Sequence, residues 1–530
     1  MNKQLKLIFI GLFSLSLYSS TFAQGYKNPV IPGFYPDPSI CRVGEDYYLV
    51  TSSFEYFPAV PLFHSKDLIN WKQIGHCLTR ASQVNLENCG VSGGIYAPTI
   101  RYHNGTFYMI TTNVSDKGNF FVYTKDPTGE WSDPIWIEQP GIDPSLYFEN
   151  GKCYLTSNPD NTIYLCEIDI KTGKQLSESK AIWTGTGGRY PEAPHIYKKE
   201  DWYYLLISEG GTEYGHQVTI ARSKKIEGPY ISNPANPILT HTKVETQMSP
   251  IQGTGHVDFV QAHNGSWWVV FLAFRPQSGL HHLLGRETFL APVRWDKNAW
   301  PVINGNGTVS LDMNVETLPQ KPIDTSSCIS DFEENNIGPE WNYLRNPHFE
   351  NYSLVQKKGT LCLKPTIVSL DSIGSPTFIG RRQQHINFTA KTTVSLNNSK
   401  AGDEAGLTVF MSNQAHYDIF IKEATGKNKK SIVLRYRLGS LEHIETEISI
   451  PENQVYLQIK GSADYYTFYY STDDKTYRPI GKMDTRYLSS ETNGGFTGVY
   501  IGLFTTSKKK TSNASADFHW FEYSPEKDRF

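Results

Sequence analysis

Short runs of apolar and aromatic residues, each bounded by polar turn residues, recur along the first three hundred residues of the chain. Residues 47–51, 107–111 and 202–206 are runs of strand length, and turns such as Asn104-Gly105 separate neighbouring runs. Asn-Gly between two apolar runs is a strong hairpin signal. Long helical periodicity is absent, so the pattern predicts a protein built from short antiparallel strands.

A larger repeat organises these strands. Five times, a Pro or an acidic residue opens a run and an aromatic residue follows about ten positions later, with spacings of 60, 46, 50 and 64 residues between units. The five members are Asp37-Pro38 with Tyr48, Ala97-Pro98 with Tyr108, Asp143-Pro144 with Tyr154, Glu192-Ala193-Pro194 with Tyr204, and His256-Val257-Asp258 with Trp268. A period of this size, filled with short strands, is typical of a β-propeller in which each unit is one blade. We therefore expect a five-bladed β-propeller over residues 24–313.

The strand pattern changes after this region. Residues 314–327 contain Pro319, Pro322 and a Thr-Ser-Ser run, and they are interpreted as a linker. Residues 328–530 return to alternating strands without the five-fold repeat, which fits a β-sandwich. The predicted fold class is all-β, a five-bladed propeller followed by a β-sandwich of the concanavalin-like jelly-roll type.

The first residues have the features of an export signal. Lys3 and Lys6 precede an apolar stretch over residues 7–17, and small residues end at Ala23. This pattern predicts a signal peptide over residues 1–23, so the protein is expected to be periplasmic or extracellular. The apolar run is too short to span a bilayer of about 30 Å, and no membrane anchor is expected.

Net charge and cysteine content bear on which partners, disulfides and metal sites the protein can have. The formal net charge is −3, and removal of the two signal-peptide lysines makes it −5. This mild acidity argues against nucleic acid or anionic membranes as partners. Seven cysteines in no metal-binding spacing give neither a disulfide pairing nor a zinc site. The 32 Tyr, 27 Phe and 11 Trp fit either sugar-stacking surfaces or simply abundant strand.

Four polar residues of the repeat are expected to meet at one point. The innermost strands of a propeller line its central channel, so the strand-start residues Asp37, Asp143, Glu192 and His256 should converge there. Two carboxyl groups about 6.5–9.5 Å apart can hydrolyse a glycosidic bond with inversion, and a third carboxylate nearby raises the pKa of the acid. Asp before Pro is also an ordinary turn opener, but its recurrence at equivalent positions favours the catalytic interpretation.

Several spaced motifs resemble glycoside hydrolase family 43, specifically its β-xylosidase-like branch. In the first half they are residues 28–40 (NPVIPGFYPDPSI), 52–58 (SSFEYFP), 64–71 (HSKDLINW), 94–98 (GIYAP), 143–146 (DPSL), 191–195 (PEAPH) and 284–287 (LGRE). In the second half, residues 378–383 (FIGRRQ), 405–409 (AGLTV) and 494–498 (GGFTG) resemble the β-sandwich appended in that branch. The resemblance covers nearly all of the chain after the signal peptide.

The resemblance implies roles for individual residues. Asp37 matches the general base, Asp143 the carboxylate that tunes and positions the acid, and Glu192 the general acid. Arg286 matches an arginine that holds the sugar. His256 matches the channel histidine, which in some members faces a bound calcium ion or a water.

Three aromatic residues match the walls of the family's pocket. Phe54 matches an aromatic wall, although core packing is an alternative. Tyr96 stands where close relatives often have Trp, so stacking in the pocket would be weaker or aimed differently. In relatives, a Phe from the sandwich closes the active site. Phe496, which follows two glycines in this sequence, is assigned to that position.

The leading hypothesis is an exported, exo-acting, inverting hydrolase that releases xylose from the non-reducing ends of β-1,4-xylo-oligosaccharides. An α-L-arabinofuranosidase of the same fold, or a bifunctional enzyme, is the alternative for xylan- or arabinoxylan-derived substrates. A non-catalytic glycan-binding protein is a further alternative. A retaining fructan-type hydrolase is disfavoured because Ile142 stands where its Arg-Asp-Pro motif has Arg. No cofactor is expected to be required, Ca²⁺ near His256 is compatible with the sequence, and the oligomeric state stays open.

Overall fold

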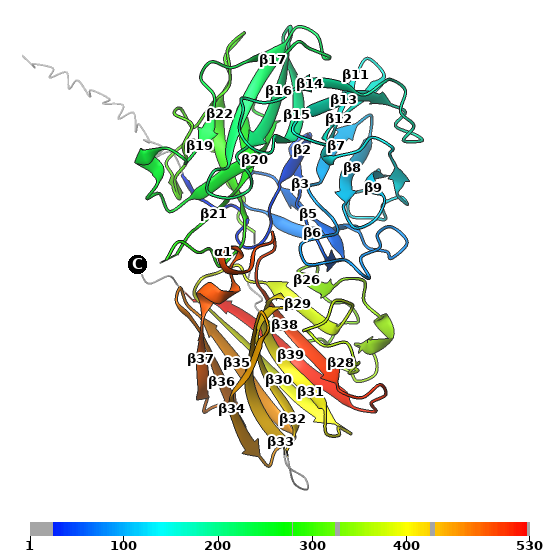
Figure 1. Cartoon of the computed structure of the whole chain (residues 1–530), viewed down its shortest axis with the longest axis vertical. Coiled ribbons are helices and arrows are strands. Elements are labelled where there is room, and N and C mark those ends of the chain that lie inside the picture. The colour runs from blue at the N-terminus through cyan, green and yellow to red at the C-terminus, as the bar shows by residue number, and fades with distance from the viewer. Residues whose placement is uncertain (1–24, 278, 324–328, 425–429, 527–530) are drawn as a thin grey trace, which may run out of the picture.

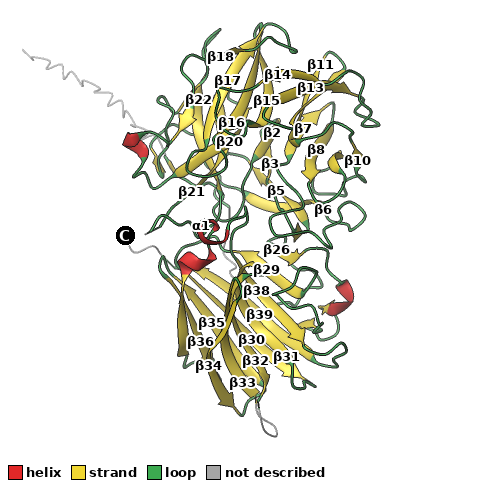
Figure 2. Ribbon diagram, viewed as in Figure 1, coloured by secondary structure: helices red, strands yellow, loops and turns green. Residues whose placement is uncertain are grey.

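The computed structural model describes residues 25–277, 279–323, 329–424 and 430–526 (Figure 1). Two β domains lie end to end along the longest axis, and strands dominate both (Figure 2). Helical elements in the described residues are the short α1 (Ser490–Asn493) and 3₁₀ turns at Val244–Thr246, Phe349–Asn351 and Thr485–Leu488. The expected signal peptide, residues 1–23, lies outside the described residues.

Five antiparallel sheets, four of them with four strands and one with five, form the first domain. The first two blades consist of β2 (Ser39–Val43), β3 (Asp46–Val50), β5 (Ala59–Ser65) and β6 (Lys72–Leu78), and of β7 (Thr99–His103), β8 (Thr106–Asn113), β9 (Gly118–Thr124) and β10 (Ile135–Trp136). The third consists of β11 (Ile142–Glu149), β12 (Lys152–Asn158), β13 (Ile163–Ile168) and β14 (Lys180–Trp183). The fourth consists of β15 (Glu192–Lys199), β16 (Trp202–Glu209), β17 (Gln217–Ser223), β18 (Ile231–Ser232) and β19 (Leu239–Thr240). The fifth consists of β20 (Gln252–Gln261), β21 (Trp267–Phe274), β22 (Glu287–Arg294) and β23 (Val302–Ile303). The predicted five-bladed propeller is confirmed, and each unit of the sequence repeat supplies the first two strands of a blade.

The beginning and end of the propeller region are fastened to each other. β1 (Tyr26–Lys27) pairs with β24 (Asp312–Met313). The side chain of Asn28 bonds both backbone groups of Leu290 in β22, at 3.0 and 2.9 Å. The segment expected to be a linker is packed where it is described, because Leu318 is buried with the propeller core.

The second domain is a sandwich of two large sheets. One has the order β34-β33-β32-β31-β38-β29-β26-β4, and the other β27-β28-β39-β30-β35-β36-β37 with β25 beside β39. The first sheet contains β4 (Tyr56–Phe57), β26 (Trp341–Leu344), β29 (Thr377–Arg382), β31 (Asp403–Ser412), β32 (Ala415–Glu423), β33 (Lys430–Leu438), β34 (Leu441–Ile450) and β38 (Tyr500–Ser507). The second contains β25 (Ile329–Ser330), β27 (Tyr352–Ser353), β28 (Leu361–Leu363), β30 (Phe388–Asn397), β35 (Gln454–Gly461), β36 (Tyr465–Ser471), β37 (Arg478–Asp484) and β39 (Ser515–Pro525). Alternating inward residues such as Tyr417, Ile419 and Ile421 of β32 fill the core between them.

The two domains share a strand and a hydrophobic cluster. β4 belongs by sequence to the first blade but pairs with β26 of the sandwich. The Tyr56 ring stacks on Tyr500, with centroids 3.9 Å apart. Phe34 and Phe54 pack in the same cluster as Phe410, Phe420 and Phe504 of the sandwich. The sandwich is therefore part of the structure that supports the end of the propeller channel.

Two further features bear on the expectations from sequence. No helix among the described residues is long and apolar enough to cross a membrane. The six cysteines in the described part of the chain are buried and free.

Candidate active site

Irregular strand starts aim four polar side chains at the propeller axis. Asp37, Asp143 and His256 have positive φ angles of 57°, 52° and 50°, and so does Ala193, next to Glu192, at 53°. The strand pairing shifts register at the same places in β11, β15 and β20. Non-glycine residues rarely adopt positive φ, and such conformations concentrate at functional sites.

The eight site residues predicted from sequence all line one small cavity of about 90 Å³. They are Asp37, Phe54, Tyr96, Asp143, Glu192, His256, Arg286 and Phe496. Thr212 also lines it and was not anticipated. The propeller axis and the sandwich together therefore create one polar pocket with aromatic walls.

Asp37 is held as a carboxylate by its neighbours. Arg286 Nη1 donates to Asp37 Oδ1 at 2.9 Å, and Ser52 Oγ donates to Oδ2 at 2.5 Å. His256 Nδ1 lies 3.6 Å from Oδ1. Burial alone would raise the pKa of Asp37, but the Arg286 guanidinium and the other polar neighbours outweigh it and hold this pKa below its usual range.

Asp143 has the opposite electrostatic environment. Its Oδ2 accepts a hydrogen bond from the backbone N–H of Ala193 at 3.1 Å, which ties it to the start of β15, where Glu192 lies. Burial and the neighbouring carboxylates of Glu192 and Asp37 raise the pKa of Asp143 well above its usual range. Repulsion between adjacent carboxylates favours retention of a proton on this side of the pocket.

His216 is a site residue that sequence reasoning missed. Its Nε2 lies 3.1 Å from Glu192 Oε1, and its side chain is fully buried. A Cβ at Gly255 would lie 2.2 Å from the His216 ring, so this glycine provides the space for the ring. His216 stands outside the repeated positions, and no local signal connects it to Glu192.

A loop of the sandwich closes the pocket. The Phe496 ring lies 6.0 Å from Phe54 and 6.1 Å from Tyr96, centroid to centroid. Its carbonyl oxygen accepts from Arg286 Nη2 at 3.2 Å, and its N–H donates to Ser92 Oγ at 2.8 Å. The aromatic walls expected at Phe54 and Tyr96 therefore meet the sandwich residue at the entrance.

A polar network drawn from all five blades fills the channel below the pocket. Arg101 Nη1 donates to Asp258 Oδ2 at 2.7 Å and its Nη2 contacts His195 Nδ1 at 3.0 Å. Ser39 and Tyr197 donate to the same Asp258 carboxylate, and Ser145 bonds His195. The network therefore joins the inner strands of all five blades across the propeller axis, two or three residues along the chain from Asp37, Asp143 and Glu192.

The pocket offers no evident calcium site. Calcium binds six to eight oxygen ligands, and no group of three His, Cys, Asp or Glu in the described residues is arranged to hold a metal ion. Both oxygens of Asp37, the carboxylate beside His256, already accept hydrogen bonds. Calcium beside His256 stays a prediction for a metal-binding measurement.

Comparison with known proteins agrees with this architecture. The model for glycosyl hydrolases family 43 matches residues 26–301, and the model for the beta xylosidase C-terminal concanavalin A-like domain matches residues 329–524. The chain is 42% identical to a non-reducing end alpha-L-arabinofuranosidase, BoGH43B, of Bacteroides ovatus, over 98% of both chains. It is 38% identical to a xylosidase/arabinosidase of Butyrivibrio fibrisolvens, over 93% of this chain and 98% of that one.

A solved structure of GH43B from a Bacteroides ovatus xyloglucan PUL superimposes with a TM-score of 0.91 at 41% identity, covering 95% of this chain and 100% of the other. The matches extend over propeller and sandwich alike, in the order found here. The chain therefore belongs to glycosyl hydrolase family 43 and is a glycosidase with an appended concanavalin A-like domain.

Proposed function

We propose that the protein is an exo-acting, inverting glycosidase that releases terminal xylose from β-1,4-xylo-oligosaccharides. One observation supports this most strongly: Asp37, Asp143 and Glu192 line one small pocket of about 90 Å³ on the propeller axis. A pocket of this size accepts the end of a chain and not its middle. The export predicted from residues 1–23 would place the enzyme in the periplasm or outside the cell.

Asp37 is proposed as the general base. Its lowered pKa keeps it ionised, so it can take a proton from a water that attacks the anomeric carbon. Arg286 lines the same pocket, and its Nη1 donates to Asp37 Oδ1 at 2.9 Å. Arg286 would thereby fix the sugar and the base relative to each other.

Glu192 is proposed as the general acid. It would deliver its proton to the glycosidic oxygen as the bond to the anomeric carbon breaks, while water supplies the new bond from the opposite face. Asp143, bonded to the Ala193 N–H, would orient the start of β15, which carries the acid. His216 would hold the Glu192 carboxyl from the buried side.

Release of α-L-arabinofuranose is the second candidate function. The names of the two relatives include arabinofuranosidase and xylosidase/arabinosidase, and both pentoses present hydroxyls that one small pocket could bind. Parallel rates on the nitrophenyl glycosides of xylose and arabinofuranose will rank the two activities.

Substitution of the acid tests the mechanism. We expect Glu192→Gln to reduce kcat/KM on xylobiose by about 10²–10⁴-fold, because this leaving group needs protonation. The loss on a dinitrophenyl xyloside should be much smaller, since that leaving group departs as an anion. Equal losses on both substrates would contradict the role of Glu192.

A further inference from the structure

A second and much larger cavity shares a wall with the catalytic pocket. It has a volume of about 790 Å³, whereas the pocket has about 90 Å³. Four residues line both cavities, namely Ile142, Glu192, Thr212 and Phe496. We call the larger cavity the outer groove.

The position of Glu192 determines which part of a substrate the outer groove would receive. This inference rests on the proposed function, in which Glu192 protonates the oxygen between the released sugar and the leaving group. Because Glu192 lines both cavities, a sugar in the small pocket directs its leaving group into the outer groove. The groove volume lies in the range of about 300–1,000 Å³ that is usual for ligands larger than one sugar ring.

Both domains build the groove. On the propeller side the ring of Tyr214 packs edge-on against Phe274 at 5.1 Å, and its hydroxyl donates to the Leu280 carbonyl. On the sandwich side the wall is the segment that carries Glu491 and Phe496. A ligand in the groove therefore touches propeller and sandwich at once.

Tyr190 is the more exposed of two exposed aromatic residues that line this groove, the other being Phe496 at 37%. Tyr190 is 58% exposed although it stands two residues before Glu192, and its backbone has a positive φ of 52°. Arg189 lies against its ring at 5.6 Å and is paired with Glu213, which also lines the groove. An aromatic face flanked by charged hydrogen-bonding groups suits a sugar ring, which has apolar C–H faces and a polar rim.

We propose that the outer groove binds a leaving group of two or more sugar residues and that Tyr190 is its stacking platform. The enzyme would then act best on chains longer than a disaccharide, although it removes one sugar at a time. Tyr190 would determine specificity without contacting the bond that breaks.

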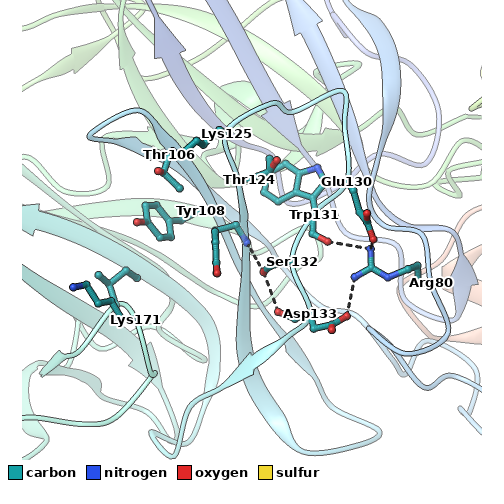
Figure 3. A pocket seen from close by; sticks show the side chains of 12 residues that line it. Arg80, Thr106, Tyr108, Thr124, Lys125, Glu130, Trp131, Ser132, Asp133 and Lys171 are labelled. Carbon is teal, nitrogen blue, oxygen red and sulfur yellow. Dashed lines mark hydrogen bonds and ion pairs between the residues drawn. The ribbon is translucent and has the colours of Figure 1, made fainter.

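Another groove of similar size provides a matched control. It has a volume of about 690 Å³, and Tyr108 and Arg80 are among the residues that line it (Figure 3). Tyr123, which is 43% exposed, also lines it, with its ring 6.2 Å from that of Tyr108. In this groove, Arg80 is paired with Glu130 and Asp133. None of its lining residues lines the catalytic pocket, so an exposed tyrosine in this groove should not contact the leaving group.

The test is the ratio of kcat/KM on xylotetraose to kcat/KM on xylobiose. We expect this ratio to exceed one by about tenfold in the wild-type enzyme, to fall towards one in Tyr190→Ala, and to stay high in Tyr190→Phe, which keeps the ring. Tyr123→Ala should keep the wild-type ratio.

Two results would overturn the proposal: a wild-type ratio near one, or equal ratios in Tyr190→Ala and Tyr123→Ala. Failure of the proposed function would look different, because the wild-type enzyme would then hydrolyse neither xylo-oligosaccharides nor nitrophenyl pentosides. If the enzyme hydrolyses a nitrophenyl xyloside but kcat/KM does not increase with the length of the xylo-oligosaccharide, only the proposed role of the outer groove is contradicted.

Discussion

At the scale of single residues, the site combines carboxyl groups in opposed electrostatic surroundings. Asp37 is paired with Arg286, whereas Asp143 faces other carboxylates across a buried pocket. These acids could be predicted because they recur at equivalent repeat positions. His216 and Thr212 could not, because they lie in the connection between β16 and β17 and reach the site through contacts with residues distant in sequence.

Ser52 gives a direct test of how Asp37 is kept ionised. Ser52→Ala removes a hydrogen bond to Asp37 without removing a group that lines the pocket. A hydrogen bond to a charged group contributes about 1.5–3 kcal/mol, and one pKa unit corresponds to about 1.4 kcal/mol. The pKa of Asp37 should therefore rise, and the acidic limb of kcat/KM should move to higher pH by about one unit. An unmoved acidic limb would contradict the role of Asp37 as the base.

At the scale of elements, the hairpins follow from the sequence but their irregular ends do not. Asn-Gly turns and alternating apolar residues predict pairs such as β7 with β8. The positive φ of Ala193 and the register shift in β15 occur where the Ala193 N–H bonds Asp143 of the neighbouring blade. Those features orient the Glu192 side chain, so its exact position could not be predicted from the sequence of β15 alone.

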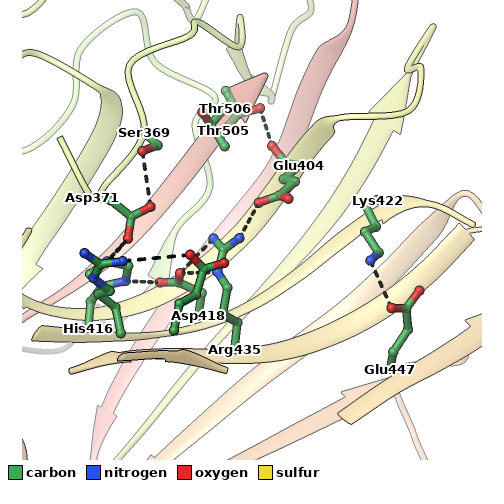
Figure 4. A network of polar contacts seen from close by, with 12 residues as sticks. Ser369, Asp371, Glu404, His416, Asp418, Lys422, Arg435, Glu447, Thr505 and Thr506 are labelled. Carbon is green, nitrogen blue, oxygen red and sulfur yellow. Dashed lines mark hydrogen bonds and ion pairs between the residues drawn. The ribbon is translucent and has the colours of Figure 1, made fainter. Parts of the chain in front are cut away.

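The outer face of the first sandwich sheet contains a buried charged cluster (Figure 4). His416 of β32 lies 2.9 Å from Asp418 and 3.3 Å from Asp371, and Arg435 of β33 contacts Asp418 at 3.0 Å. Burial alone would lower the pKa of His416, but the two aspartates raise it to about 9. Asp418, through these partners, has a pKa of about 2.

This cluster predicts a pH-dependent stability. The folded-state pKa of His416 lies above its unfolded value of about 6.5, so its stabilisation is fully present below about pH 6.5 and is lost as pH rises to about 9. The loss should be on the order of 3 kcal/mol in the free energy of unfolding. Urea denaturation across this range should show a steeper decline for the wild-type protein than for His416→Gln. Parallel curves for the two proteins would contradict the assignment.

At the scale of the whole molecule, the sandwich is joined to the catalytic pocket. The two domains were predictable from the change in repeat pattern, but the pairing of β4 with β26 was not, because Tyr56-Phe57 is too short to be distinguished as a strand of another sheet. Glu491 of α1 contacts His282 of the propeller at 2.6 Å, and the His282 ring stacks on Phe274. This contact fastens the segment that presents Phe496.

Loss of that contact should open the pocket. We expect Glu491→Ala to lower kcat/KM on nitrophenyl xyloside by about tenfold, mainly through KM, because a displaced segment withdraws Phe496 and its carbonyl from Arg286. Glu447→Ala, which removes a surface ion pair with Lys422 in the sandwich, is the matched control and should have no effect. Equal kinetics for the two variants would mean that the sandwich does not hold the pocket closed through Glu491.

The central claim is that Asp37 directs water to a terminal sugar while Glu192 protonates the leaving oxygen. Proton NMR of the purified enzyme acting on xylobiose, read before the anomers equilibrate, tests it most directly. The account predicts that α-xylose appears first, because inversion of a β-linkage yields the α-anomer. Initial release of β-xylose would contradict it and would make Asp37 a nucleophile.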